Sequence, residues 1–219
     1  MPPKAILFDL DGTLLDSLAD IADSCNAALS HHSFPTHPTE SYKFFVGDGV
    51  ATLLERTLPT SHNNLATIAE VSLTYRSEYQ KRWNQKTRPY PGVAELLDTL
   101  IERRFKLAVL SNKPDDFTRQ CVTNLLADWR FDIVMGSVPT LPHKPHPAGA
   151  LQLARTLNLP PADFVYLGDT STDMQTAVGA KMLPVGVLWG FRPEAELLAY
   201  GAKHLLKHPL DLLPLLDRV

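Results

Sequence analysis

The chain has 219 residues, of which 44% are hydrophobic and 21% are charged, as in ordinary globular proteins. Its formal net charge is -3 and it has no basic run, which argues against binding nucleic acid by neutralising phosphates. No apolar stretch approaches the roughly 20 residues that cross a bilayer. Two aspartates interrupt the apolar start of the chain too early for a secretory signal. We therefore expect no nucleic-acid partner, no membrane partner and no export.

Two cysteines occur, Cys25 and Cys121, and both lie in patterns typical of helix faces. Cysteines so far apart in the sequence give neither a disulfide framework nor a pair of thiolate metal ligands. A reducing, cytoplasmic location fits this cysteine usage best.

Short apolar runs along the chain predict strands that are buried on both faces, as in a parallel sheet covered by helices. The first run lies almost at the start of the chain and the others lie from residue 107 onward. They are residues 5–8, 107–110, 164–167 and 183–188, and a further apolar stretch, residues 131–134, precedes the polar segment that holds Lys144.

Helical patterns lie between the later runs. Residues 93–101 carry an apolar stripe with the i, i+3, i+4 spacing of a helix. Residues 174–178 carry a shorter stripe, and Gly179 is expected to cap that helix at its C-terminus. The alternation of strands and helices predicts an α/β core with an open, Rossmann-like, mostly parallel sheet.

The stretch 16–88 breaks this alternation because it holds no convincing strand, although residues 42–46 are ambiguous. Helical stripes at 18–29 and 63–83 predict helices there, and the restricted sequence at 88–92 ends the stretch. We therefore expect an inserted α-helical cap domain, residues 16–88, on an α/β core formed by residues 1–15 and 89–219.

Polar residues follow the predicted strands at the edge of the sheet where open α/β proteins bind their ligands. Carboxylate oxygens are ligands for Mg²⁺, which leaves coordination sites for water and a substrate phosphate. A lysine and small polar donors can hold phosphoryl oxygens as charge develops on them. The set, which predicts a magnesium-dependent phosphoryl-transfer site, is Asp9, Asp11, Ser111, Asn112, Lys144, Asp169 and Asp173.

Each of these signals has an ordinary structural explanation. The dipeptide Asp11-Gly12 alone favours a hairpin turn, and Gly168-Asp169 alone favours a loop that caps a helix. The joint occurrence of such residues at successive strand ends favours chemistry. A carboxylate can attack phosphorus, and a second one two residues on can move the proton of the leaving alcohol.

At these positions the sequence resembles the haloacid dehalogenase-like hydrolase superfamily, in particular its phosphoglycolate phosphatase-like group. The likeness covers nearly the whole chain. It rests on residues 9–14 (Asp-Leu-Asp-Gly-Thr-Leu), Ser111 with Asn112, Lys144, and residues 168–173 (Gly-Asp-Thr-Ser-Thr-Asp). Residues 45–49 and 189–193 also resemble phosphoglycolate phosphatase sequences, whereas His146 stands where such proteins commonly have aspartate.

The resemblance implies an aspartyl-phosphate mechanism with Mg²⁺ as the cofactor. Asp9 is then the nucleophile and a metal ligand. Asp11 is the general acid and base, and its backbone carbonyl also faces the metal. Asp169 is expected to bind the metal directly, and Asp173 either directly or from behind the ligands.

The resemblance also implies that Ser111, Asn112 and Lys144 hold the phosphoryl group under a cap that selects the leaving group. In the cap, the possible substrate contacts are Gly47, Asp48 and Gly49, together with the basic residues Lys43, Arg56, Arg76 and Lys81.

The expected function is therefore Mg²⁺-dependent phosphomonoester hydrolysis of a small phosphorylated metabolite, first of all 2-phosphoglycolate, by a monomer or homodimer. Asp11 argues against dehalogenases, which lack that acid, and against phosphonoacetaldehyde hydrolases, which carry alanine there. Three alternatives stay open: a phosphatase for another small ester or pyrophosphate, a β-phosphoglucomutase-like mutase, and a non-catalytic phosphate-binding module. The cap lacks the Arg-Gly motif of the mutases.

Overall fold

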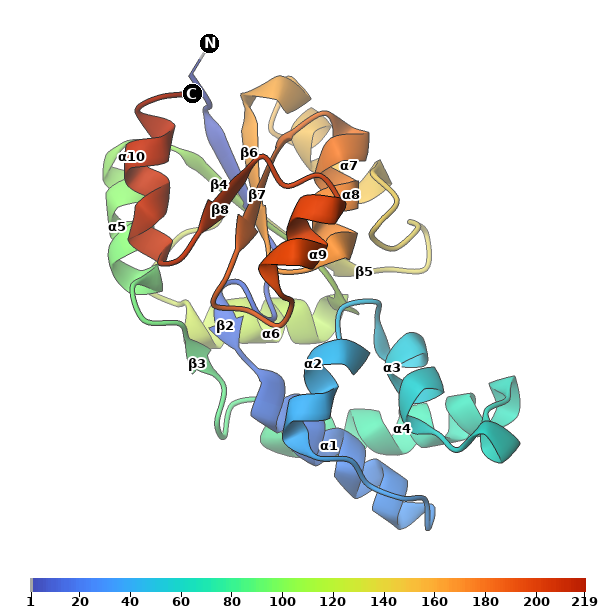
Figure 1. Ribbon diagram of the computed structural model, residues 1–219. Helices are drawn as coiled ribbons and strands as arrows, with labels where there is room; N and C mark the ends of the chain where they lie inside the picture. Colours follow the sequence, from blue (N-terminus) through green and yellow to red (C-terminus); the bar gives the residue numbers. More distant parts are fainter. Residues whose placement is uncertain (1) are drawn as a thin grey trace.

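The first strand, β1 (Ala5–Phe8), lies inside a six-stranded sheet of the computed structural model, which describes residues 2–219 (Figure 1). All four of its residues are buried, as its wholly apolar sequence predicts. It pairs in parallel with β4 (Lys106–Pro114) on one side and with β6 (Phe164–Gly168) on the other. The remaining strands are β5 (Ile133–Ser137), β7 (Leu183–Val187) and β8 (His204–Leu206).

The strand order is β5-β4-β1-β6-β7-β8, and every pair is parallel. The predicted α/β class with a Rossmann-like sheet is thereby confirmed. Two details differ from the expectation. The strand β4 continues to Pro114, so Ser111 and Asn112 lie within it rather than after it. The edge strand β8 was not expected, because it is only three residues long and half-buried.

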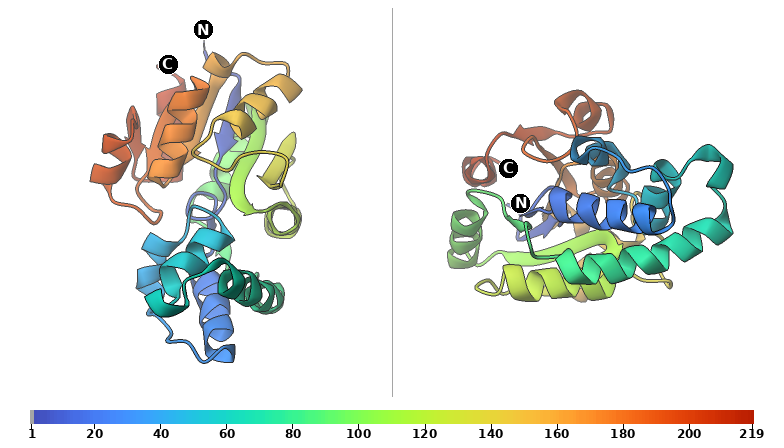
Figure 2. Two further views of the ribbon diagram at one scale, coloured as in Figure 1. Left: turned by 90° about the vertical axis from the view of Figure 1, so that its right-hand side faces the viewer. Right: turned by 90° about the horizontal axis from the view of Figure 1, so that it is seen from below.

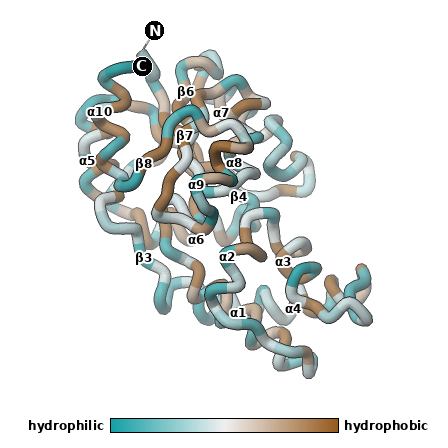
Figure 3. The backbone as a smooth tube through the Cα atoms, viewed as in Figure 1, coloured by the Kyte–Doolittle hydropathy of each residue, from teal (hydrophilic) through white to brown (hydrophobic). Residues whose placement is uncertain are grey.

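Helices cover both faces of the sheet, as two views show (Figures 1 and 2). Alternate residues of β1 point to opposite faces, so Ile6 and Phe8 join one apolar cluster, while Ala5 and Leu7 join another. Apolar residues gather on the strands and on the helix faces turned toward them (Figure 3). These helices are α5 (Val93–Glu102), α6 (Asp115–Leu125), α7 (Ala148–Thr156), α8 (Ser171–Ala180), α9 (Glu194–Ala199) and α10 (Leu212–Leu216).

The expected end of α8 is wrong. Gly179 lies inside this helix, and the chain leaves it at Lys181, whose φ of 60° is left-handed. A Cβ atom at position 179 would come within 3.3 Å of the Pro147 ring, so the glycine serves close packing rather than capping. Val178 is 50% exposed and therefore does not belong to the buried stripe of the helix.

Residues 16–88, called here the helical insert, leave and rejoin the core through two short strands. These strands, β2 (Leu15–Asp16) and β3 (Arg88–Pro89), pair antiparallel. The insert lies at the end of the sheet opposite the two chain termini, and α1 packs along α4 (Figures 1 and 2). The ambiguous residues 42–46 form a short helix. The helices are α1 (Leu18–His31), α2 (Tyr42–Phe45), α3 (Val50–Thr57) and α4 (Leu65–Arg82).

Short 3₁₀ turns complete the connections. They are Thr39–Ser41, Thr60–His62, Pro161–Asp163 and Pro209–Asp211. None of the helices formed by residues 2–219 has the length and hydropathy needed to span a bilayer.

One buried carboxylate ties the two connections of the insert together. Asp20, at the start of α1, is only 1% exposed. It accepts hydrogen bonds from the backbone N–H of Lys86 at 2.9 Å and from the backbone N–H and hydroxyl of Thr87 at 2.8 and 2.7 Å. Because residues 86–87 lead directly into β3, this carboxylate fixes the outgoing chain to the returning chain.

Asp20→Ala is expected to lower the free energy of unfolding by about 3 kcal/mol, because buried donors that lose their acceptor cost roughly 1–3 kcal/mol each. Urea denaturation measures the change. The matched control is Asp23→Ala on the same helix, which removes only an exposed ion pair with Lys86. That pair is worth at most about 1 kcal/mol. Equal losses in the two variants would show that the buried contacts of Asp20 add nothing.

Candidate active site

The loop after β1 brings its two aspartates to the carboxyl edge of the sheet. The backbone N–H of Asp9 still pairs with the carbonyl of Leu167 on β6, at 2.9 Å. The chain then turns at Gly12, whose φ of 89° favours glycine. A Cβ atom there would lie 2.3 Å from a carboxylate oxygen of Asp169. The absence of a side chain at Gly12 therefore allows the ends of β1 and β6 to meet.

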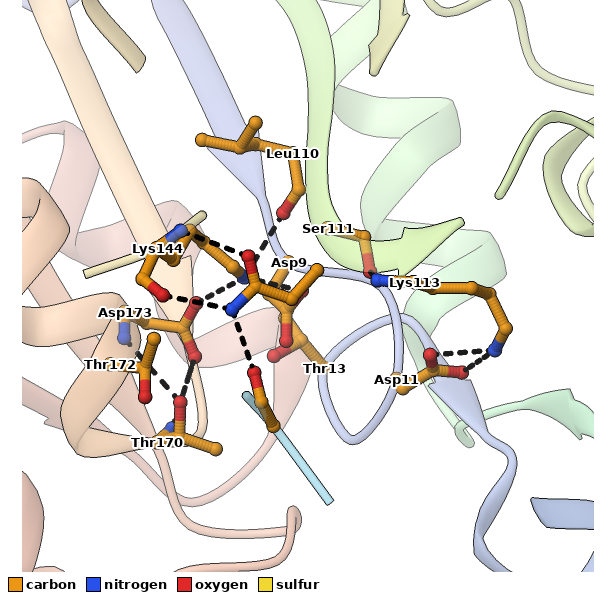
Figure 4. A network of polar contacts seen from close by, with 12 residues as sticks. Asp9, Asp11, Thr13, Leu110, Ser111, Lys113, Lys144, Thr170, Thr172 and Asp173 are labelled. Carbon is orange, nitrogen blue, oxygen red and sulfur yellow. Dashed lines mark hydrogen bonds and ion pairs between the residues drawn. The ribbon is translucent and has the colours of Figure 1, made fainter. Parts of the chain in front are cut away.

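Three buried carboxylates and one lysine converge at this edge. Figure 4 shows Asp9, Asp173 and Lys144 side by side there. Oxygens of Asp9, Asp169 and Asp173 all lie within 4.8 Å of one another. The ammonium of Lys144 donates to an oxygen of Asp9 and to an oxygen of Asp173, both at 2.7 Å, and to the carbonyl of Leu110 at 3.1 Å. These four predicted site residues therefore lie in one cluster.

The cluster carries more negative than positive charge. Burial, followed by repulsion from Asp173, raises the pKa of Asp9 from its usual 3.8 to about 7, although Lys144 opposes the rise. Burial and repulsion from Asp9 also raise the pKa of Asp169 well above its usual value. Burial lowers the pKa of Lys144, but Asp173 and Asp9 outweigh it, so the net shift is upward. A cluster of three carboxylates with excess negative charge suits a small hard dication such as Mg²⁺.

Asp173 is held on all sides. One of its oxygens accepts from Lys144 and from the hydroxyl of Tyr166, the latter at 3.2 Å. The other accepts from the backbone N–H and the hydroxyl of Thr170, at 3.1 and 2.7 Å. Thr170 and Asp173 form a capping box at the start of α8. The spacing Thr-x-x-Asp is a sequence signal for this box, although Thr170 was not among the residues predicted for the site.

Asp169 is held by neighbours that were likewise not predicted from the sequence. The hydroxyl of Thr13 donates to one of its oxygens at 3.2 Å, and the backbone N–H of Phe191 donates to the other at 2.8 Å. Trp189 in turn donates its indole N–H to the carbonyl of Thr13 at 3.0 Å. The segment after β7 thus helps to position a carboxylate that follows β6.

Asp11 stands apart from the three-carboxylate cluster. Its oxygens lie 2.5 and 2.6 Å from the ammonium of Lys113, and one of them also accepts from the hydroxyl of Ser17 at 2.5 Å. Burial lowers the pKa of Lys113, but the charge of Asp11 outweighs it and raises the pKa overall. Lys113 was not assigned a role from the sequence. Its spacing of two from Ser111 along β4 places both side chains on one face, which was the available signal.

Ser111 and Asn112 lie between the lysines. The hydroxyl of Ser111 accepts from the backbone N–H of Lys113 at 3.2 Å and is buried. The side-chain amide of Asn112 donates to the carbonyls of Gly47 and Lys144, both at 3.0 Å, and accepts from the backbone N–H of Lys144 at 2.9 Å. Asn112 thus connects the Lys144 loop to the helical insert.

The insert reaches the core through the loop between α2 and α3. Gly47 and Gly49 line the pocket described next. Asp48 points elsewhere: it accepts from the hydroxyl of Thr172 at 2.7 Å and pairs with Arg56 at 2.6 Å. Asp48 therefore joins the insert to the first turn of α8.

A pocket opens between the core and the insert, beside Asp9 and Asp11. The core contributes these carboxylates and residues 111–113, while the insert contributes mainly apolar side chains, among them Leu53 and Tyr75. The pocket volume is about 50 Å³, on a scale where one water needs about 10–15 Å³. This size suits a small ester.

None of the four basic residues of the insert named as candidates lines this pocket. Each is instead paired with an acidic side chain on the protein surface or at the edge of the insert. The pairs are Lys43 with Glu40, Arg56 with Asp48, Arg76 with Asp116, and Lys81 with Glu78.

Comparison with known proteins identifies the family. Residues 6–187 match the family of haloacid dehalogenase-like hydrolases. A phosphoglycolate phosphatase of Psychrobacter arcticus is 34% identical over 201 residues, which cover 87% of this chain and 86% of that protein. One of Aquifex aeolicus is 30% identical over 214 residues, which cover 98% of this chain and 97% of that protein.

Solved structures agree with the sequence matches. A haloacid dehalogenase-like family hydrolase from Streptococcus pneumoniae superposes with a TM-score of 0.87 at 26% identity, over 97% of this chain and 98% of that one. The matched residues 6–187 include the three-carboxylate cluster and both lysines. The chain therefore belongs to the haloacid dehalogenase-like hydrolases, in their phosphoglycolate phosphatase-like group, and is a phosphatase.

Proposed function

We propose that the protein is a Mg²⁺-dependent phosphomonoester hydrolase that works through an aspartyl-phosphate on Asp9, with 2-phosphoglycolate as its main substrate. The observation that carries the proposal is the position of Asp9. Its carboxylate lies between Lys144 and two further carboxylates on one side and the pocket on the other. The names of the two relatives support the choice of substrate.

In the first step, an oxygen of Asp9 attacks phosphorus, and the bond from phosphorus to the ester oxygen breaks as the new bond forms. Asp11, which lines the same pocket, donates a proton to the departing alcohol oxygen. Asp11 must enter the first step protonated and leave it as a carboxylate. In the second step, that carboxylate takes a proton from the water that attacks phosphorus, and the bond to Asp9 breaks. Phosphate leaves, and both aspartates return to their starting states.

Lys144 and Ser111 hold the phosphoryl oxygens during both steps. Asp9 and Asp169, with the backbone carbonyl of Asp11, are the groups that would hold Mg²⁺. The ion supplies positive charge against the phosphoryl group. Because four donors already occupy Asp173, we assign it to orienting Lys144 and to adding charge behind the ligands.

Asn112 and the insert do not touch the reacting atoms; they hold other parts of the site in place. Asn112 fixes the Lys144 loop through two of its three hydrogen bonds. We propose that residues 16–88 are a cap domain that excludes water from the pocket during the first step. The cysteines Cys25 and Cys121 are free and buried, which is consistent with the proposed cytoplasmic location. The oligomeric state stays a prediction of monomer or homodimer.

The test is phosphate release from a panel of esters, with kcat/KM compared across 2-phosphoglycolate, a sugar phosphate, pyrophosphate and p-nitrophenyl phosphate. We expect activity that EDTA abolishes and Mg²⁺ restores, with the highest kcat/KM for 2-phosphoglycolate. Activity that survives EDTA would refute the metal requirement. A higher kcat/KM for another ester would refute the substrate while leaving the phosphatase chemistry in place. An isomerised sugar phosphate as product would favour a mutase.

A further inference from the structure

Lys113 occupies an unusual place for a lysine. Its side chain is only 6% exposed, and its ammonium lies against both oxygens of Asp11. On its other side the ammonium is 5.0 Å from the ring centroid of Tyr79, which comes from α4 of the insert. A lysine buried in this way needs a compensating partner, because desolvating an unpaired charge is costly. Asp11 provides that partner in the absence of substrate.

Lys113 also faces the pocket. Among the described residues that line this pocket, it is the only one with a cationic side chain. An ammonium has three N–H donors. Within residues 2–219, Asp11 is the only residue that accepts a hydrogen bond from it. One donor is therefore available to a ligand without the loss of the ion pair. The apolar walls, which include Leu53 and Phe117, strengthen any charge interaction made there.

The two buried lysines lie on opposite sides of the nucleophile. Lys144 binds Asp9 and Asp173, while Lys113 binds Asp11 (Figure 4). A substrate with phosphorus at Asp9 must place its ester oxygen within reach of Asp11, since that residue protonates it. The rest of the leaving group then lies beside Lys113. The insert offers no basic side chain to this pocket in the described structure.

We propose that Lys113 recognises a negative charge on the leaving group, and that the preferred substrates are therefore small phosphate esters with a carboxylate near the ester oxygen. The inference rests on the proposed phosphatase activity and adds the residue that selects the leaving group. Lys113 donates its available N–H to the substrate carboxylate, while Asp11 remains beside it. Lys113 is a specificity residue that lies in the core, in contrast to the expectation that cap side chains make this choice.

The experiment compares 2-phosphoglycolate with 2-phosphoglycolamide, in which a neutral amide of almost the same size replaces the carboxylate and the phosphate is unchanged. Wild-type enzyme is expected to prefer the acid in kcat/KM by about 10- to 100-fold, the range for one hydrogen bond to a charged group. Lys113→Met should remove most of this preference, mainly by raising KM for the acid. Lys113→Arg, which keeps the charge, should retain part of it. A loss in kcat/KM that is equal for both esters would leave the preference intact, so Lys113 would act through Asp11 alone and the inference would be overturned.

The ratio of kcat/KM for the two esters decides whether Lys113 recognises the substrate carboxylate. A wild-type enzyme without preference for the acid would overturn it, and so would a Lys113→Met enzyme that keeps the full preference. If Lys113→Met does not fold, inhibition of wild-type p-nitrophenyl phosphate hydrolysis by glycolate and by glycolamide replaces it. Glycolate should then bind at least about tenfold more tightly, and equal binding would refute the inference. An enzyme inactive on p-nitrophenyl phosphate would instead refute the proposed phosphatase.

Discussion

Asp9→Asn is expected to lower kcat for every phosphate ester by a factor on the order of 10⁴ to 10⁶, as the loss of a covalent nucleophile does in other enzymes. The amide has nearly the shape of the carboxylate but cannot form the phosphoenzyme. It can still accept a hydrogen bond from Lys144, which donates to Asp9 at 2.7 Å. Phosphate release from 2-phosphoglycolate and from p-nitrophenyl phosphate, both with Mg²⁺, measures the loss.

The fold is expected to survive this substitution. The folded-state pKa of Asp9 is raised to about 7, so its contribution to stability is lost as the pH rises through that value. At pH 8 without metal, the neutral asparagine removes a destabilising charge, and we expect a Tm at or above that of the wild type. Asp23→Asn, at an exposed site on α1, is the matched control with full activity. An Asp9→Asn enzyme within about tenfold of wild-type kcat would contradict covalent catalysis.

Asp11→Asn is expected to lower kcat for 2-phosphoglycolate by about 10²- to 10⁴-fold, the usual contribution of a general acid or base. The alkoxide of glycolate is a poor leaving group and needs the proton, whereas p-nitrophenolate leaves without one. Rapid-mixing measurements with p-nitrophenyl phosphate should therefore show a first turnover that is much less affected. The later turnovers should be slow, because the second step also needs Asp11 as a base.

Asparagine at this position can still accept hydrogen bonds from Lys113 and Ser17, which now donate to the Asp11 carboxylate. A thermal melt that matches the wild type shows that the site has kept its structure. Equal losses for the first turnover of both esters would contradict the acid role. Such losses would indicate instead that the substitution displaces Lys113 or removes the negative charge beside it.

The sequence was sufficient for the central strands of the sheet because their signals are local. The run Ala5–Phe8 is apolar at every position, and the strand has the same bounds. The predicted end of α8 was wrong because Gly179 looks like a C-cap but lies inside the helix, where a Cβ atom would be 3.3 Å from the Pro147 ring. Such a contact joins residues far apart in the sequence, and no pattern within a helix reports it.

The difference between local signals and contacts between distant residues also explains which site residues could be predicted. Residues within motifs at strand ends, such as Asp9 and Asp169, could be found from the sequence, because parallel strands bring their carboxyl ends together. The pairing of Lys113 with Asp11 could not, since it depends on how β4 lies beside the loop after β1. The surface pairing of Arg56 with Asp48 likewise appears only in three dimensions.

The insert meets the core partly through main-chain atoms. The carbonyl of Gly47 accepts from Asn112 at 3.0 Å, and that of Val46 accepts from Arg192 at 2.8 Å. A carbonyl is present whatever side chain the residue carries, so these two contacts do not constrain the amino acid at position 46. Val46 lines the pocket, so evolution can vary this residue while the insert keeps the same two contacts with the core. One hydrolytic core can acquire new substrates by this route.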